Sequence, residues 1–158
     1  MITLMALGEI IYEHTGKMIS RRVLDVEGPK IETTFRATGK FKGTDITETT
    51  TYWSVPRPGG ALYGEAQGIV ITNDDSGEIA TLTAQGVGRI TGPGGKVSFR
   101  GSTYFRTTST RKLASLNNVV GVFEYEMDES GNSTAKNLGI DIVAFCYRYD
   151  LVNESNLL

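Results

Sequence analysis

Two carboxylates set within alternating apolar segments have the clearest chemical potential in this chain. Glu48 lies two residues from Ile46, and Glu65 lies an even number of residues from Tyr63 and Ile69. Alternate side chains of a β-strand share one face, so each carboxylate would enter an otherwise apolar interior. Desolvation disfavours the charged form of a buried carboxyl group and gives it acid or base capacity near neutral pH. Glu48 and Glu65 are therefore candidate catalytic residues, although a one-residue slip of register would turn both toward water, which is the simpler and favoured interpretation.

Polar side chains that share strand faces with apolar ones form a second candidate set. If Val97 and Phe105 point inward, as their apolarity argues, Thr103 does so too, and the same alternation turns Tyr125 inward. Hydroxyl and amide groups in small number orient a ligand within an apolar pocket. The candidate ligand-binding residues are Tyr52, Tyr63, Gln67, Thr103 and Tyr125.

Metal and triad chemistry lack the residues that they need. His14 is the only histidine, which leaves no cluster for zinc, and a single surface or satisfied histidine is the default interpretation. No G-x-S-x-G segment supplies a nucleophile elbow for a serine triad. The acidic turn at 73–78 is too short to encircle calcium. We therefore expect no metal site.

The glycine-rich turns lack the spacing of nucleotide-binding loops. Around Gly95 and Lys96 the phosphate-binding loop would need a glycine and a hydroxyl at the positions that Ile90 and Val97 occupy. After Gly86-Val87-Gly88, Thr91 replaces the third glycine of the dinucleotide fingerprint, and a strand follows instead of a helix. These glycines are better explained as turn positions, and we expect no cofactor.

Composition and charge place the chain among ordinary globular proteins. It has 158 residues, of which 39% are hydrophobic and 22% charged, and a formal net charge of −2. The charge gives no reason to expect nucleic acid. Arg100 and Arg106 share a face, which is better explained as a solvated outer face than as an anion site. The chain has no apolar run of roughly 18 residues for a membrane span. Because the single Cys146 cannot form an intramolecular disulfide, a cytoplasmic location fits best.

Alternating segments separated by turn residues predict about eight strands. They cover the first 17 residues, 18–26, 30–55 as one long strand or a bent pair, 62–72, 78–90, 96–107, 119–127 and 140–151. Only 108–118 offers a helical turn, which we expect as a short plug or a 3₁₀ turn. Strands joined by tight turns favour an all-β, up-and-down antiparallel barrel, with a two-sheet sandwich as the main rival. We expect a single domain over 1–158 with a frayed tail from about residue 152.

The run from Gly39 to Gly131 resembles a known group of barrels. The segments GEAQGIVIT, DDSGE, AQGVGRITGPGGKVSFRGSTYF and NVVGVFEYEMDESGN share their rhythm of glycines and β-formers with small, uncharacterised prokaryotic proteins that are related in fold to allene oxide cyclase. The resemblance implies an eight-stranded barrel around a cavity, often in a homo-oligomer. The cyclase itself works without a cofactor on an oxygenated fatty acid. None of its functional residues aligns with a position of this chain.

Two functional hypotheses follow. In the first, the protein binds a small hydrophobic ligand in the barrel cavity. In the second, it is a cofactor-independent isomerase or cyclase that acts on a lipid-like or small hydrophobic substrate, with Glu65 or Glu48 as the general acid–base. A purely structural or oligomer-forming role is a third option. Fold analogy alone does not choose between them.

Overall fold

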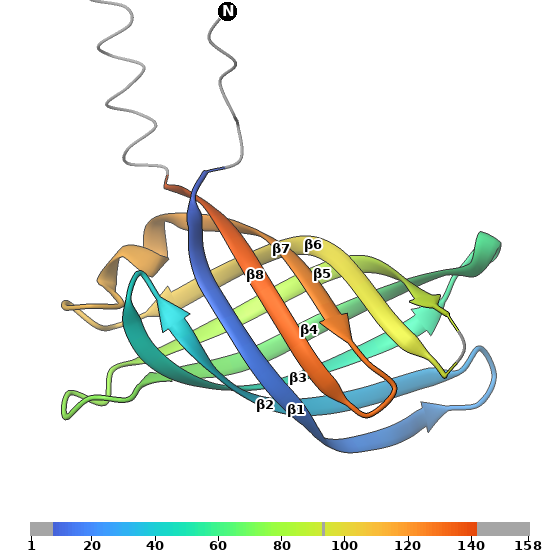
Figure 1. Cartoon of the computed structure of the whole chain (residues 1–158). Helices are drawn as coiled ribbons and strands as arrows, with labels where there is room; N and C mark the ends of the chain where they lie inside the picture. Colours follow the sequence, from blue (N-terminus) through green and yellow to red (C-terminus); the bar gives the residue numbers. More distant parts are fainter. Residues whose placement is uncertain (1–7, 93, 142–158) are drawn as a thin grey trace, which may run out of the picture.

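The computed structural model describes residues 8–92 and 94–141, and these residues form a closed eight-stranded antiparallel barrel (Figure 1). Every strand pairs with the next one in the sequence, and β8 pairs with β1 to close the sheet. The strands are β1 (Ile10–Asp25), β2 (Lys30–Phe41), β3 (Thr44–Pro56), β4 (Ala61–Thr72), β5 (Ile79–Thr91), β6 (Lys96–Thr107), β7 (Val119–Met127) and β8 (Asn132–Asp141). The predicted up-and-down barrel is confirmed, and the rival sandwich is wrong because the β1–β8 ladder leaves a single closed sheet.

The turn before β5 falls where the sequence predicts it, whereas the turn between β2 and β3 lies inside a segment that was expected to be continuous or bent. Gly77, with φ of 54°, ends the turn before β5, and Gly43, with φ of 82°, completes the turn between β2 and β3. The segment expected as one long strand or a bent pair is therefore the β2–β3 hairpin. Residues 10–25, which were expected to contribute to two strands, form the single strand β1.

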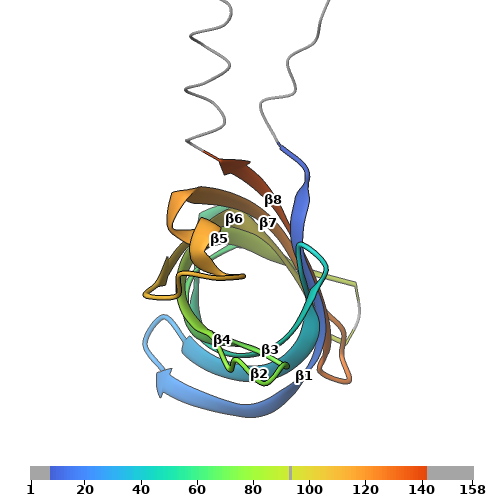
Figure 2. The ribbon, with the colours of Figure 1, turned by 90° about the vertical axis from the view of Figure 1, so that its left-hand side faces the viewer.

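One end of the barrel is closed by the connection between β6 and β7. It contains the 3₁₀ turn η2 (Ala114–Asn118), which lies across the end that faces the viewer in Figure 2. Leu113 and Leu116 are completely buried there and pack in one apolar cluster with Phe41, Val70 and Phe105. The predicted plug is thus confirmed. A second short 3₁₀ turn, η1 (Pro58–Gly60), connects β3 to β4.

The carboxylate of Glu78 anchors this plug. Glu78, at the start of β5, accepts hydrogen bonds from the backbone N–H of Leu113 at 2.9 Å and of Lys112 at 3.2 Å, and also from the Ser109 hydroxyl. These bonds hold the pKa of Glu78 below its usual value, with the Ser109 bond as the largest cause. Glu78 is therefore a structural group that ties the connection to the barrel.

The barrel interior has two apolar clusters with a polar layer between them. Along β3, Ile46 belongs to the cluster under the plug and Tyr52 to the cluster toward the other end, while Glu48 and Thr50 lie between them. We call this layer the polar belt and define it by the buried residues His14, Glu48, Thr50, Thr103 and Asn137. The belt lies where a soluble barrel of this size would normally be filled by apolar side chains.

Three predictions on the carboxyl end fall largely outside the described residues. These are the strand at 140–151, the thiol of Cys146 and the frayed tail; only residues 140 and 141 of that strand are described, as the last two residues of β8. Within the described ranges, no helix is both long and apolar enough to cross a membrane.

Candidate functional site

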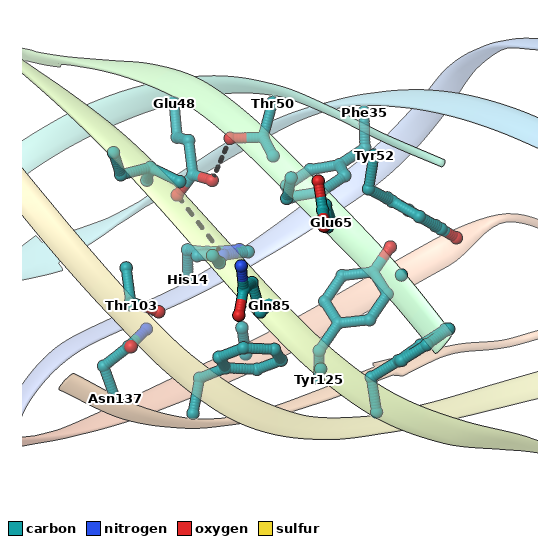
Figure 3. A pocket seen from close by; sticks show the side chains of 18 of the residues that line it. His14, Phe35, Glu48, Thr50, Tyr52, Glu65, Gln85, Thr103, Tyr125 and Asn137 are labelled. Atoms are coloured by element: carbon teal, nitrogen blue, oxygen red, sulfur yellow. Dashed lines mark hydrogen bonds and ion pairs between the residues drawn. The ribbon is translucent and has the colours of Figure 1, made fainter. Parts of the chain in front are cut away.

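The candidate site is built around Glu48, whose side chain lies in the barrel interior with 2% of the residue exposed. Its carboxylate accepts hydrogen bonds from the Tyr12 hydroxyl and the Thr50 hydroxyl. The His14 Nε2 atom lies 3.3 Å from Glu48 Oε2. Figure 3 shows the carboxylate between the side chains of His14 and Thr50. Three donors thus surround a buried carboxylate.

Small residues on β2 allow β1 and β3 to meet across it. Ala37 pairs with Glu48 and Gly39 pairs with His14, so the strand between the two partners presents almost no side-chain volume. A Cβ atom at Gly39 would lie 2.0 Å from the Glu13 carbonyl oxygen and 2.7 Å from His14 Cβ. This glycine therefore allows a close approach of the β1 backbone.

The same arrangement recurs around the belt. Three of the polar side chains face a glycine directly across the strand ladder, and each glycine leaves space beside its polar partner. The pairs are His14 with Gly39, Thr50 with Gly68, and Thr103 with Gly121. A Cβ atom at Gly68 would lie 2.0 Å from the Thr50 hydroxyl oxygen, and one at Gly121 would lie 3.0 Å from Asn137 Oδ1. The glycines keep the middle of the barrel open.

His14 is neutral in this environment. Burial lowers the pKa of its imidazole, and the neighbouring Glu48 only partly opposes that effect. We assign the proton to Nε2 because this atom faces the carboxylate, which leaves Nδ1 as an acceptor. The ring stacks on Phe35 with centroids 5.5 Å apart. The carboxylate therefore fixes both the tautomer and the orientation of the imidazole.

A cavity of about 80 Å³ adjoins the belt. A water molecule needs roughly 10–15 Å³ of such space, so the cavity accommodates several waters or an organic molecule of a few non-hydrogen atoms. Three lining residues carry buried polar atoms without a hydrogen-bond partner among the described residues: His14 Nδ1, Asn137 Oδ1 and the Tyr125 hydroxyl. Burial raises the pKa of Tyr125 and of Tyr52, so both phenols keep their protons and can donate.

Five of the predicted site residues line this cavity, and Glu65 is the one among them that does not face the interior. Glu48, Tyr52, Thr103 and Tyr125 all face the interior, as the alternation in β3, β6 and β7 predicted. The apolar residues that framed the prediction, Val97 and Phe105 among them, are buried as expected.

The inward orientation that would make Glu65, Tyr63 and Gln67 site residues is wrong, and the favoured interpretation, in which this face points to water, holds for β4. In β4 the residues that alternate with them, such as Val70, are the buried ones, and Gln67 is exposed. Glu65 borders the cavity wall, yet its carboxylate accepts a 2.7 Å hydrogen bond from the Tyr63 hydroxyl, whose ring stands beside Trp53 on the outer face. The alternative of a shifted register therefore holds for β4 and fails for Glu48 in β3.

Sequence reasoning missed Tyr12, His14 and Asn137. The β1–β8 register is irregular between Ile10 and Tyr12, and both Ile11 and Tyr12 are buried, so the alternation that would have placed His14 inward is broken just before it. Asn137 lies on a strand whose inward positions are small or polar, which gives no apolar alternation to detect.

Two exclusions made on the sequence can be compared with the structure. Within residues 8–92 and 94–141, no three His, Cys, Asp or Glu side chains lie close enough to hold a metal ion. Arg100 lies on the outer wall, where it forms ion pairs with Glu124 at 3.5 Å and Glu126 at 3.0 Å, and Arg106 is exposed as well. The solvated outer face is therefore the correct account of these arginines.

The chain is a closed eight-stranded antiparallel β-barrel, and solved structures of bacterial proteins are similar to it in fold. A protein of unknown function from Clostridium acetobutylicum ATCC 824 matches with a TM-score of 0.70 and 14% identity over 84% of this chain and 97% of its own. A conserved protein of unknown function from Rhodopseudomonas palustris matches with a TM-score of 0.65 and 13% identity over 83% of this chain and 94% of its own. A beta-barrel like protein from Acinetobacter baumannii AYE has a TM-score of 0.67 and 14% identity over 83% and 93%.

At these identities the likeness concerns the fold alone. No protein-family model matches the sequence, and neither does any curated protein. The function therefore has to be inferred from the site itself.

Proposed function

We propose that the protein binds a small, largely hydrophobic molecule that carries one polar group in the cavity beside the polar belt. The observation that supports this most is the set of three buried polar atoms, on His14, Asn137 and Tyr125, that converge on one cavity without protein partners in the described part of the chain. A buried donor or acceptor left unpaired costs about 1–3 kcal/mol. A ligand that hydrogen-bonds to these atoms would remove that cost.

The size of the cavity limits the ligand. Typical drug-sized pockets measure roughly 300–1,000 Å³, whereas this one measures about 80 Å³. A compact molecule of a few non-hydrogen atoms fits this space better than a long acyl chain. The resemblance to allene-oxide-cyclase-like barrels thus supports an interior site but not a substrate of fatty-acid length.

Native mass spectrometry of the gently purified protein, followed by solvent extraction, tests this proposal. We expect a mass increment that disappears on denaturation. Ala84, whose side chain is buried in the cavity wall, offers a filling variant, Ala84→Leu, and Thr83→Leu on the exposed face of the same strand is its control. The mass increment should be absent in Ala84→Leu and present in Thr83→Leu. Two results would contradict a cavity site: an increment that persists in Ala84→Leu, or a native protein that shows no increment either as purified or after addition of small molecules.

The pairing of His14 with Glu48 favours a second candidate, a cofactor-independent isomerase. A carboxylate that holds a neutral imidazole in one tautomer and stabilises its protonated form is an established arrangement for a general base. In such a reaction on a β,γ-unsaturated ketone, His14 Nδ1 removes a proton from the α-carbon and returns it to the γ-carbon, while the carbon–carbon double bond moves from the β,γ to the α,β position. Atoms and electrons balance without a further reactant.

Deuterium uptake from D₂O into a panel of small ketones, followed by NMR, tests the isomerase. We expect uptake above the buffer rate with the native protein and none above it with His14→Asn. Equal uptake in both proteins would rule out His14 as the base. If the native protein also takes up deuterium only at the buffer rate, ligand binding is left as the function that the site supports.

A further inference from the structure

The charge of the cavity identifies the class of ligand. Glu48 is buried, and the three groups that donate to it, the Tyr12 and Thr50 hydroxyls and the His14 imidazole, are neutral donors. Among the described residues, no lysine or arginine lines the cavity. Buried charges in proteins are normally paired with an opposite charge. The described residues therefore leave this carboxylate with hydrogen bonds but without a counter-charge.

The walls of the cavity suit a cation as well. Phe35, Tyr52, Phe99 and Tyr125 line it and pack edge-on or tilted against one another, with centroids 5.4 Å apart for Phe35 and Tyr125 and 6.0 Å apart for Tyr52 and Phe99. The face of an aromatic ring carries negative potential and attracts an organic cation. Aromatic rings around a carboxylate are the combination that recognises alkylated ammonium groups.

His14 is the only group in the lining that could supply the missing positive charge from within the protein. Its imidazole is buried and stacked on Phe35. If Nδ1 were protonated, the described part of the chain would offer no acceptor for a hydrogen bond from it. Protonated histidine needs acceptors at both nitrogens when it is buried. The geometry thus favours the neutral ring and leaves the counter-charge to a ligand.

We infer that the ligand of this cavity is a small organic cation, an alkylammonium whose positive charge lies against Glu48 and whose alkyl groups contact the aromatic rings. The inference rests on the proposed function, because it names the chemical class of the molecule that the cavity binds. The carboxylate supplies the charge selectivity, and the rings and the limited volume select for a compact alkyl body.

Three probes of similar shape and different charge test this inference: trimethylammonium, tert-butanol and pivalate. The readout is the NMR signal of the His14 imidazole, which is the only imidazole in the chain and therefore reports on the site. We expect trimethylammonium to bind at least about tenfold more tightly than tert-butanol, and pivalate to bind most weakly, because only the cation pairs with the buried carboxylate.

The variant Glu48→Gln should reduce the affinity for trimethylammonium by about tenfold or more and leave that for tert-butanol unchanged, since it removes the charge and keeps the shape. Glu124→Gln, on the outer wall, is the matched control and should change neither affinity. Binding of tert-butanol or pivalate as tight as that of trimethylammonium would overturn the cation inference and leave cavity binding intact. If no probe shifts the His14 signal and no molecule copurifies with the protein, both proposals fail.

Discussion

Replacing Glu48 by glutamine should stabilise the ligand-free protein. Glutamine can retain all three contacts, because its oxygen can accept from Tyr12 and His14 and its amide can donate to the Thr50 oxygen. Only the charge is lost. Burying one carboxylate costs several kcal/mol, whereas three charge-assisted hydrogen bonds return about 1 kcal/mol each over neutral ones. The expected net gain is about 1–3 kcal/mol in the free energy of unfolding.

Thermal and urea unfolding at neutral pH measure this gain. In a chain of this size 1 kcal/mol corresponds to roughly 2–4 °C in the melting temperature, so Glu48→Gln should melt several degrees higher than the native protein. Glu124→Gln, at an exposed ion pair on the outer wall, should change the free energy by no more than about 1 kcal/mol. A loss of more than about 1 kcal/mol in Glu48→Gln would show that the carboxylate is a structural partner of a protonated His14, and the reasoning on the cavity charge would be refuted.

The remaining predictions concern the belt and the plug. The NMR titration of His14 should give a pKa below 6.5. Because the unfolded chain then binds the proton more readily, the free energy of unfolding should fall as the pH drops from 6.5 toward the folded pKa. The variant His14→Asn should lack this pH-dependent loss of stability. Gly39→Ala should destabilise the protein by about 1–3 kcal/mol through overpacking against Glu13 and His14, in contrast to Thr38→Ala on the outer face; an unchanged urea midpoint would contradict the close approach. Since the pKa of Glu78 is lowered, its contribution to the free energy of unfolding should be lost as the pH falls below about 4.5. The variant Glu78→Gln should speed hydrogen exchange at the Leu113 amide, and an unchanged exchange rate would show that Glu78 does not anchor the plug.

The closed barrel could be predicted because turns and alternation are local properties of the sequence. Turn glycines such as Gly77 and the alternation in β5, β6 and β7 fixed the hairpins. A single antiparallel sheet with eight strands then removes its unpaired edges by closing into a barrel. The order of pairing from β2 to β7 follows from these local signals, whereas only residues 140 and 141 of the closing strand β8 (Asn132–Asp141) fall within a predicted strand.

The facing of β4 could not be predicted because it depends on the volume available inside the barrel. Large residues from other strands, Phe99 for example, already fill the interior, and a Cβ atom at Gly64 would lie 3.5 Å from that ring. Small residues of β4 therefore face inward, and Ile69 and Ile71 stand outside with 49% and 41% exposure. Apolarity alone assigns the opposite face, so Glu65 was misplaced.

The site itself joins strands that are far apart in the sequence. Glu48 was identified from its own strand, but its partners Tyr12 and His14 come from β1, across a strand that contributes only Ala37 and Gly39 at this level. The pairing depends on the register of two ladders, β1 with β2 and β2 with β3. No local pattern carries that information.

The most direct test of the central claim is an atomic-resolution crystal structure of the protein purified without denaturation. The account predicts electron density for a compact molecule in the cavity, within hydrogen-bond distance of Asn137 or Tyr125 and beside Glu48. A cavity closed by its own side chains, with the polar atoms of His14, Asn137 and Tyr125 all bonded to other protein groups, would contradict it.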